Sequence, residues 1–509
     1  MLNGKELGVV LTPKSTVDYI ISRLGDIKKD EVILDPCVGP GAFIKGLLKA
    51  GVKSDQIFSF DINSEYKEKI EKLNVSFKTQ DTLLSLTSDS YNQFDYIIGN
   101  PPYLNKASKY IRNNRIQLKK VYGKINAHET YAMFLVNGIL RLKEGGKLGF
   151  ITSDSFLTLR THAKLRRFIL DNCKIDEIIL APRNLFENQN VSTSPAIIIL
   201  TKCSGKKNKD KRKNNIMRII PRLKSEQEYQ NPKTIHEIKQ KQYELLPFNL
   251  FFIDVDEEVI KFFKRASNLE KYLKGFIGMH THDNLKYIAA IEETELASIF
   301  KKKNQRIQVN RKKYKIISKK QFNSGNWKPY LKRGGDDQYY RPIMEALDWN
   351  DDSITNYDIP SNVPFEEKGI VISGISSRLA ARYMPNGCYW DSNKAIGFIL
   401  KDNSISIEYM LGLLNSSFYN YLAKGIINNT NSIQITGIHA LPFIPPERDF
   451  KEKIEKIVKK IILKKKTDIN YDYSQEQRQI DDLIFNYHAK IFNLRRRLKT
   501  KIDEKYCIY

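Results

Sequence analysis

Four consecutive residues, Asn100, Pro101, Pro102 and Tyr103, have the types and order needed for chemistry on an amino group. The two prolines lack a backbone N–H and fix the chain, so carbonyl oxygens are left as acceptors. The side-chain oxygen of Asn100 and the carbonyl of Pro101 can together accept both hydrogens of a planar NH₂ group. Two acceptors stabilise the positive charge that develops when this nitrogen accepts a methyl group. Tyr103 offers a face on which a base lifted out of a duplex can stack.

A glycine-rich turn between a strand and a helix lies upstream, in Leu34–Phe43 (LDPCVGPGAF). Gly39 and Gly41 let the backbone approach a ligand closely, and the N-terminus of the following helix favours a carboxylate or phosphate. Asp61 closes the next strand, where a carboxylate can accept hydrogen bonds from both hydroxyls of a ribose. Asp81 lies twenty residues further on and can accept from an adenine amine. Each acid alone could be a helix cap or a surface turn, but their order favours a nucleotide-like ligand.

Short apolar strands alternate with amphipathic helices through the first half of the chain. The predicted strands are Glu31–Asp35, Ile57–Asp61, Phe94–Gly99, Gly146–Ile151, Ile175–Leu180 and Ala196–Leu200, and the predicted helices include Ala42–Ala50 and Lys164–Leu170. Strands separated by helices predict βαβ units and an α/β fold with a mainly parallel sheet. The chemical residues then follow strands, at the carboxyl ends where such folds bind their ligands.

On these residues the chain resembles the gamma-group N6-adenine DNA methyltransferases of restriction–modification systems, over nearly its whole length. Gly8–Pro13 (GVVLTP) is similar to the family's N-terminal motif, and Asn100–Tyr103 matches the catalytic motif in full. The resemblance implies a Rossmann-like domain that uses S-adenosylmethionine (AdoMet) as the methyl donor. Thr82 stands where the family often has an aromatic residue. The residues that the resemblance assigns to AdoMet are Thr12, Asp35, Pro36, Gly39, Gly41, Asp61 and Asp81.

The resemblance also implies that the target adenine is turned out of double-stranded DNA and held between two aromatic rings. Tyr103 would supply one ring, and Phe186, in the segment LFENQNVSTSPAIIIL, would supply the other. The catalytic residues are then Asn100, Pro101, Pro102 and Tyr103. A separately encoded restriction endonuclease is the functional partner that such enzymes often have.

The residue pattern changes around Pro247–Leu250, which predicts a domain boundary. We expect an AdoMet-binding catalytic domain in residues 1–250, an α+β target-recognition domain that binds DNA in 251–450, and a helical segment in 451–509. In the last segment, Ile480, Leu483, Ile484 and Tyr487 recur at helical spacing and predict an amphipathic helix. The basic run Lys202–Asn215 is predicted to be a solvated hairpin loop.

Composition narrows the class of protein. The 84 Lys and Arg outnumber the 58 Asp and Glu, and the net charge of +26 favours a polyanionic partner such as DNA, although a lysine-rich proteome would give the same surplus. The five cysteines are scattered, and His280 and His282 have no ligand cluster near them in sequence, so we expect no metal site. No apolar run is long enough for a bilayer and no leader precedes the first strand, which predicts a cytoplasmic protein without a membrane partner.

Several alternative functions remain open at this point. The same four-residue motif occurs in enzymes that methylate a protein glutamine and in some that methylate RNA. Methylation of cytosine N4 in DNA is a further alternative, although the first motif residue is more often Ser than Asn in those enzymes. A fused nuclease is less favoured because we find no acid–lysine cluster typical of one. A DNA-binding subunit without catalysis is less favoured because the motif and the acidic residues are intact.

Overall fold

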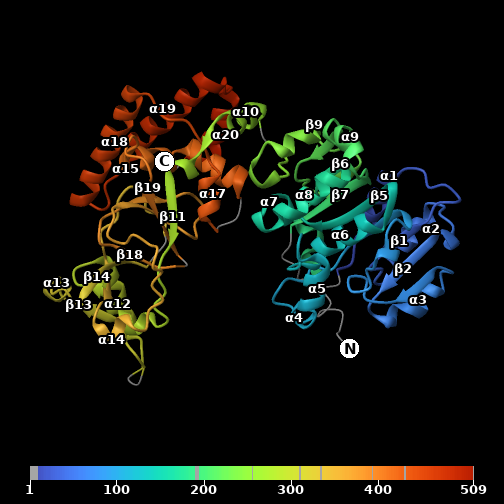
Figure 1. Ribbon diagram of the computed structural model, residues 1–509, viewed down its shortest axis with the longest axis horizontal. Coiled ribbons are helices and arrows are strands. Elements are labelled where there is room, and N and C mark those ends of the chain that lie inside the picture. Colours follow the sequence, from blue (N-terminus) through green and yellow to red (C-terminus); the bar gives the residue numbers. More distant parts are fainter. Residues whose placement is uncertain are drawn as a thin grey trace. The chain divides into compact units, whose positions relative to one another are not determined.

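The chain forms two compact units, Met1–Val255 and Asp256–Tyr509, which we describe separately. The computed structural model describes residues 10–189, 194–254, 256–308, 311–332, 335–392, 394–428 and 432–507. Figure 1 shows the first unit in blue to green and the second in yellow-green to red. Among the described residues, none of the helices is both long enough and apolar enough to cross a membrane.

A nine-stranded sheet with the order β3-β2-β1-β4-β5-β7-β6-β8-β9 forms the centre of the first unit. Neighbouring strands are parallel from β3 to β5, whereas β7 runs antiparallel to both of its neighbours. The expectation of an α/β fold with a mainly parallel sheet is confirmed. The strands are β1 (Ile33–Asp35), β2 (Ile57–Asp61), β3 (Ser76–Thr79), β4 (Phe94–Gly99), β5 (Leu142–Ser153), β6 (Cys173–Leu180), β7 (Pro195–Lys202), β8 (Ile216–Ile220) and β9 (His236–Lys239).

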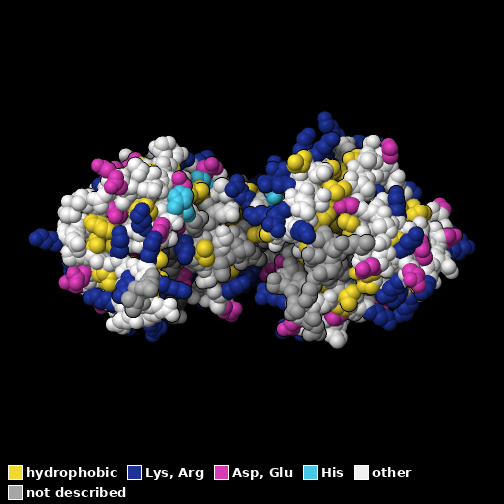
Figure 2. All heavy atoms as spheres, turned by 90° about the horizontal axis from the view of Figure 1, so that it is seen from below, with side chains coloured by type: hydrophobic (Ala, Val, Ile, Leu, Met, Phe, Trp, Pro, Cys, Tyr) yellow, Lys and Arg dark blue, Asp and Glu magenta, His cyan; other side chains and the backbone are white. Residues whose placement is uncertain are grey.

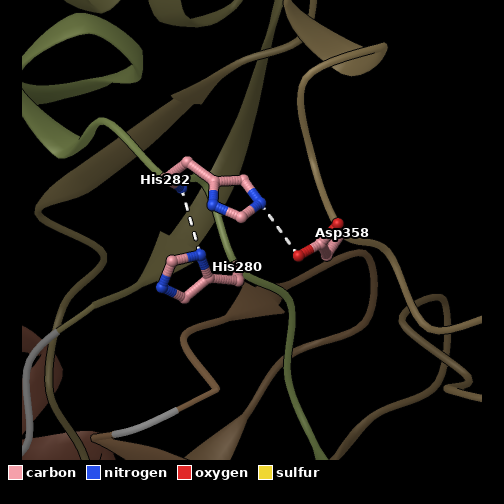
Figure 3. A group of neighbouring side chains, drawn as sticks. All are labelled: His280, His282 and Asp358. Carbon is pink, nitrogen blue, oxygen red and sulfur yellow. Dashed lines mark hydrogen bonds and ion pairs between the residues drawn. The ribbon is translucent and has the colours of Figure 1, made fainter.

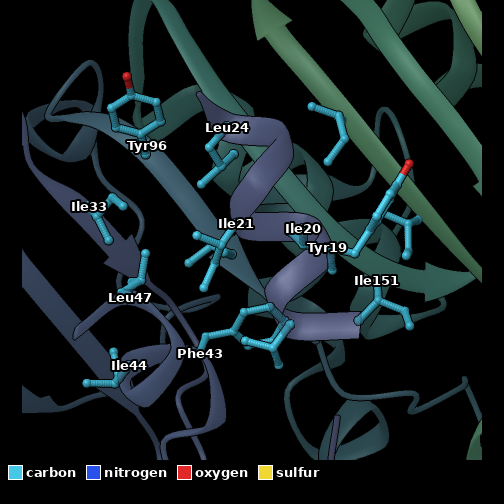
Figure 4. Packing of buried hydrophobic residues seen from close by; sticks show 14 of the residues in the cluster. Tyr19, Ile20, Ile21, Leu24, Ile33, Phe43, Ile44, Leu47, Tyr96 and Ile151 are labelled. Atoms are coloured by element: carbon cyan, nitrogen blue, oxygen red, sulfur yellow. The ribbon is translucent and has the colours of Figure 1, made fainter. Parts of the chain in front are cut away.

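Helices cover both faces of this sheet because residues that alternate along a strand point to opposite sides. On β5, Gly149 leaves room for Ile20 of α1, while Leu148 packs toward Gly138 of α6. Figure 4 shows α1 lying over the sheet, with Ile21 near the α2 side chains. The helices of this unit are α1 (Lys14–Leu24), α2 (Ala42–Lys49), α3 (Lys67–Glu71), α4 (Lys109–Asn113), α5 (Arg115–Tyr122), α6 (Thr130–Arg141), α7 (Ser155–Thr158), α8 (Ala163–Asn172) and α9 (Lys209–Lys213).

The helix α1 is fixed to the sheet by one buried carboxylate. Glu177 of β6 is 1% exposed and accepts a hydrogen bond of 2.5 Å from the hydroxyl of Tyr19. It also pairs with Arg23 of α1 at 3.2 Å and with Arg218 of β8 at 2.9 Å. A buried charge must be paired in this way, and removing one partner of such a group is costly. The segment just before α1 is therefore anchored as well, and it reaches the functional site described below.

The prediction of a solvated hairpin for Lys202–Asn215 is right about exposure, since most of residues 205–211 are exposed, but wrong about the hairpin, since β7 and β8 are not paired with each other. The run contains the short helix α9, and Arg212 within it is buried. Its guanidinium donates to the carbonyl oxygen of Leu170 in α8 and to those of Cys203 and Gly205 just after β7, so it ties α8 to the turn that follows β7. A charged side chain with several donors can be buried when backbone carbonyls accept all of them, and sequence composition cannot reveal such acceptors.

The second unit combines two larger sheets with peripheral helices. One sheet has the order β11-β19-β16-β17, the other β13-β12-β15-β14-β18, and β10 pairs with β20. Trp390 of β18 is fully buried between the two larger sheets, against Phe365 and against Gly397 of β19. The strands are β10 (Ser267–Asn268), β11 (Leu273–Ile277), β12 (Ile288–Ile291), β13 (Lys315–Ile317), β14 (Trp327–Leu331), β15 (Glu345–Asp348), β16 (Gly369–Ser373), β17 (Ala381–Met384), β18 (Tyr389–Trp390), β19 (Ala395–Leu400) and β20 (Pro442–Phe443).

The C-terminal helices pack within this second unit. Phe262 of α10 lies against Phe418, His488 and Phe492, so that segments far apart in sequence share one aromatic cluster. The predicted amphipathic helix is α19, in which Ile480 and Ile484 are buried. The helices are α10 (Glu257–Arg265), α11 (Asn284–Tyr287), α12 (Glu295–Gln305), α13 (Lys319–Phe322), α14 (Asp351–Ile354), α15 (Ile407–Asn415), α16 (Ser417–Asn420), α17 (Ile435–His439), α18 (Arg448–Thr467), α19 (Ser474–Phe492) and α20 (Arg496–Tyr506).

Candidate active site

A pocket of about 860 Å³, part of it open to solvent, lies at the carboxyl ends of β1, β2 and β4 in the first unit. Of the residues that the sequence singled out, the lining includes Thr12, Pro36, Gly39, Asp61, Asp81, Asn100 and Pro102. Asp35, Gly41, Pro101, Tyr103 and Phe186 are not part of the lining. Parallel strands explain the convergence, because their carboxyl ends meet at one edge.

The turn after β1 is shaped by its two glycines. Gly39 and Gly41 have φ of 49° and 87°, in the left-handed region that side chains disfavour. A Cβ on Gly41 would also come within 2.6 Å of the Ile70 side chain. The backbone can therefore turn sharply into α2, and it leaves the pocket wall at Gly39 free of a side chain.

Asp35 lies beneath this turn. Its side chain is 1% exposed, and its Oδ1 accepts the backbone N–H of Cys37 at 3.1 Å. Burial raises the pKa of Asp35 to about 8; the Cys37 N–H lowers it, and the nearby charge of Asp61 raises it further. The carboxyl group of Asp35 thus stabilises the turn by accepting a hydrogen bond from its backbone.

Asp61 presents its carboxylate at the end of β2. One oxygen accepts the N–H of Gly39 and the other the N–H of Asn63, both at 2.8 Å. Burial raises the pKa of Asp61, and these two N–H groups lower it. Each carboxylate oxygen has a further lone pair, so the oriented group can still accept the hydroxyls of a ribose.

Asp81 is held from two sides. Its Oδ1 accepts the backbone N–H groups of Leu83 and Leu84 at 3.0 Å, and the Tyr110 hydroxyl lies 2.9 Å from Oδ2 and 3.0 Å from Oδ1. Thr82 is buried, and its hydroxyl donates to the carbonyl of Pro36 at 2.7 Å, which ties the two turns together. The rings that line the pocket are Phe43, Tyr110 and Phe134, rather than a ring at position 82.

Asn100 is fixed in one orientation at the end of β4. Its Nδ2 donates to the carbonyl oxygen of Val10 at 3.1 Å and to the hydroxyl of Thr12 at 3.0 Å. Its Oδ1 is buried and has no hydrogen-bond partner among the described residues. A buried acceptor without a partner costs free energy and is a feature to be explained. Because both donors of the amide are used, the oxygen is the atom that remains for a ligand.

The two prolines are held by α6. The hydroxyl of Thr130, the first residue of α6, donates to the carbonyl of Pro102 and accepts the N–H of Leu104 at 3.0 Å. Sequence reasoning missed Val10, Tyr110 and Thr130, since a lone tyrosine or threonine carries no local signal. Only the contacts across the fold identify them.

Tyr103 and Phe186 lie next to each other. Their ring centroids are 6.3 Å apart, and the ring planes are inclined by 55°. Phe186 is 1% exposed in a turn between Arg183 and Gln189, and its φ and ψ of −117° and 16° interrupt the helical geometry there. The Tyr103 hydroxyl is buried without a partner among the described residues. The two rings are in contact and inclined, so a base can enter between them only if they move apart.

Arginine is the residue that most often reads base edges in DNA, but two arginines of the second unit, Arg341 and Arg378, have structural partners. Arg341 is 3.8 Å from Asp337 and 3.7 Å from Glu345, and Arg378 donates to the carbonyl of Asp336 at 3.3 Å. Arg333 lies outside the described residues. Lys and Arg side chains, dark blue in Figure 2, are spread over both units, with acidic side chains between them.

Two family models match the chain. The N-6 DNA methylase model matches residues 2–267, and the TaqI-like C-terminal specificity domain model matches residues 302–445. Among curated proteins, the type II methyltransferase M.HincII of Haemophilus influenzae is 31% identical over 180 residues, 34% of this chain and 33% of that protein. M.BanIII of Aneurinibacillus aneurinilyticus is 30% identical over 210 residues, 35% of this chain and 36% of that protein. The match thus spans about a third of the length of these relatives.

Solved structures share the fold over most of the chain. The type IIL restriction–modification enzyme MmeI, in complex with DNA, aligns with a TM-score of 0.56 at 12% identity, over 95% of this chain and 72% of that one. A nuclease-deletion mutant of the type ISP enzyme LlaGI aligns with a TM-score of 0.54 at 16% identity, over 89% of this chain and 54% of that one. The structural likeness supports the fold, and the N-6 DNA methylase model covers more than half of the 509 residues. The chain therefore belongs to the N-6 DNA methylase family.

Proposed function

We propose that this protein methylates N6 of an adenine in double-stranded DNA, with AdoMet as the methyl donor. The observation that carries the proposal is the Oδ1 of Asn100, a buried acceptor without a described partner at the edge of a pocket. An exocyclic NH₂ group supplies the hydrogen that this oxygen lacks. The family match supports the reaction class.

The chain's own residues account for the activation of the amine. Asn100 accepts one hydrogen of the NH₂ group through Oδ1, and the carbonyl of Pro101 accepts the second. The bonds from Nδ2 to Val10 and Thr12 prevent the side-chain amide of Asn100 from rotating by 180°. Such a rotation would place the NH₂ group of Asn100 against the NH₂ group of the base, and both are hydrogen-bond donors. Fixed acceptors stabilise the charge that develops on nitrogen without having to reorganise.

The pocket fits AdoMet, whose sulfonium supplies an electrophilic methyl group when it is bound. Asp61 accepts the ribose hydroxyls, Asp81 accepts from the adenine amine, and the bare backbone at Gly39 allows close approach. Thr12 and Pro36 complete the cofactor wall. In this assignment Asp35 and Gly41 act indirectly, by shaping the turn, since both are outside the pocket lining.

The target base is held by Tyr103 and Phe186. Since their rings are in contact at 55°, we propose that they separate as the base enters and then cover its two faces. Stacking on such rings is worth about 1–3 kcal/mol per base. Removing the Phe186 ring should then weaken capture of the base with little effect on AdoMet affinity.

We propose that residues 1–250 form the catalytic domain, 251–450 the DNA-recognition domain, and 451–509 a helical segment that packs on it. The specificity-domain match over residues 302–445 supports the second assignment. M.HincII and M.BanIII are type II methyltransferases by name, so a separately encoded endonuclease is the proposed functional partner.

The test is incubation of unmethylated double-stranded DNA with the protein and AdoMet carrying a labelled methyl group, followed by digestion to nucleosides. We expect label in N6-methyl-2′-deoxyadenosine, and a strongly reduced amount with Asn100→Ala. Label in N4-methylcytosine alone would change the assigned base. Label in protein or RNA, with none in DNA, would overturn the proposal.

A further inference from the structure

Three side chains that can bind a metal ion converge in the second unit (Figure 3). His280 and His282 follow β11, and Asp358 lies in the segment before β16, 76 residues from His282. One ligand atom from each lies within 4.8 Å of the others. Among the described residues this is the one such group of three histidine, cysteine or acidic side chains. The catalytic proposal above makes no use of it.

The backbone holds the two segments together. His280 and Asp358 form an isolated antiparallel bridge, in which each N–H donates to the other's carbonyl, at 3.1 Å and 3.0 Å. Met279 is tied in the same way to the strand end at Trp390 and Ser392, at 2.9 Å and 3.0 Å. The ligand positions are thus defined by main-chain bonds, as a preorganised site requires.

The chain then bends so that the second histidine faces the first. His282 has a φ of 59°, in the left-handed region that few residues other than glycine adopt. Thr281 beside it is 2% exposed, and its hydroxyl donates to the side-chain oxygen of Asn284 at 2.7 Å. The buried threonine therefore fixes the bend, and the two imidazole rings meet with centroids 4.5 Å apart.

The hydrogen bonds of the two rings show which nitrogen of each ring faces the group. The backbone N–H of His282 donates to Nδ1 of His280 at 3.2 Å, so this Nδ1 is unprotonated and has a lone pair. Figure 3 shows the same Nδ1 on the side of the ring that faces His282. The Nε2 of His282 lies 2.8 Å from Oδ2 of Asp358. The side chains of His282 and Asp358 are 57% and 74% exposed, so an ion can reach them from solvent.

We propose that His280, His282 and Asp358 bind a divalent transition-metal ion, with Zn²⁺ as the representative. Two imidazoles and one carboxylate suit zinc, copper or nickel, whereas magnesium and calcium prefer oxygen ligands alone. The ion takes the place of the bond from the His282 backbone N–H to Nδ1 of His280 and of the bond between His282 Nε2 and Asp358. The Nε2 proton of His282 is released to solvent and Nδ1 of the same ring carries a proton instead, so the imidazole stays neutral. The released backbone N–H of His282 is at the surface, where water can accept it. Three protein ligands leave a coordination position for water.

The experiment uses the full chain without a histidine tag. Isothermal titration with Zn²⁺ should show about one ion per chain, and Co²⁺ should give visible absorption bands without a thiolate charge-transfer band. His280→Ala, His282→Ala and Asp358→Asn should each weaken Zn²⁺ binding by about tenfold or more, since each removes a direct ligand. His236→Ala, at a half-buried histidine of β9, is the matched control and should leave the affinity unchanged.

The outcomes are distinct from those of the methylation assay. The variant Asn100→Ala should lose methylation and keep Zn²⁺ binding, because the proposed metal site does not rest on the catalytic assignment. Circular dichroism without metal checks that each variant is folded, and Asp358→Asn keeps the shape of the side chain. Absence of Zn²⁺ binding, equal binding by all variants, or a Co²⁺–thiolate band from one of the free cysteines would each overturn the proposal.

Discussion

The pocket of the first unit and the histidine cluster of the second are assembled in different ways. Gly39, Asp61 and Asn100 lie at or just beyond the carboxyl ends of three different strands, and adjacent parallel strands carry them to one edge of the sheet. His280 and Asp358 are instead joined by a single antiparallel bridge between two loops. The first arrangement follows from the parallel sheet, which places the carboxyl ends of its strands side by side. The second arrangement depends on one particular backbone contact.

The two sites also differ in solvent exposure. The decisive atom of the pocket, Oδ1 of Asn100, is buried, whereas the side chains of His282 and Asp358 are largely exposed. A fixed, buried acceptor has a strong effect on a reacting charge, whereas water weakens the electrostatic effect of exposed side chains. We therefore expect point changes to affect the pocket more severely, in the following order.

The largest effect is expected at Asn100. Asn100→Ala removes the acceptor for the reacting amine and should lower the methylation rate by roughly a hundredfold or more, with DNA and AdoMet binding nearly kept. Single-turnover methylation together with binding titrations measures both. If Asn100→Ala retains most of the methylation rate, the pocket is not more sensitive to point changes than the histidine cluster, and the contrast between the two sites is lost.

Asp61→Ala comes next, because it removes a charged acceptor that Gly39 and Asn63 hold in place. We expect AdoMet affinity to fall by about ten- to a hundredfold, equivalent to roughly 1.5–3 kcal/mol for hydrogen bonds to a charged group. Calorimetry measures it. The matched control is Asp55→Ala, an exposed acid near the opposite end of β2. Equal losses in both variants would mean that the change is in the fold and not in the pocket.

Thr12 tests whether orientation of the catalytic amide matters. Thr12→Val keeps the shape of the side chain but removes the acceptor for Nδ2 of Asn100, so the amide of Asn100 is rotated into the wrong orientation part of the time. We expect a decrease in turnover of about fivefold to tenfold, as for one hydrogen bond. Thr12→Ser should restore the rate, since it keeps the hydroxyl. If the serine and valine variants are equally slow, the methyl group of Thr12 and not its hydroxyl is important.

The smallest effect is expected at Tyr110. Tyr110→Phe keeps the ring in the pocket wall and removes the hydroxyl that contacts Asp81, whose Oδ1 still has two backbone partners. AdoMet affinity should decrease by about threefold to tenfold, the range for one ordinary hydrogen bond. Titration of AdoMet into this variant and into Asp81→Ala would show whether the two changes act through the same carboxylate.

Much of the sheet could be predicted from the sequence because its signals are local. Ile57–Asp61 and Phe94–Gly99 have the predicted bounds, since a buried parallel strand is a short apolar run with turn residues at its end. The motif at Asn100 follows such a run directly. The same reasoning did not predict the burial of Arg212 in the basic run, which depends on carbonyl acceptors in α8 and within the run itself.

The partners of the site residues could not be predicted. The contact between Thr12 and Asn100 joins residues 88 positions apart, and that between Asp81 and Tyr110 spans 29. We expected His280 and His282 to be ordinary loop residues because no ligand is near them in sequence, yet Asp358 contacts His282 across 76 positions. Such pairings arise from tertiary packing, and the spacing of residues along a single sequence does not reveal them.

The buried carboxyl group of Asp35 also makes the free energy of unfolding depend on pH. Its pKa is raised to about 8 in the folded chain, above the value of about 3.9 of an unfolded aspartate, so unfolding between these values releases a proton. Stability should therefore fall as the pH rises through this window, by up to roughly 1.4 kcal/mol per unit, and level off above it. Asp35→Asn, which has no proton to release, should show a shallower decline in melting temperature from about pH 5 to about pH 8. The pH at which the protein is stored thus affects its folding equilibrium through a residue that lies outside the pocket lining.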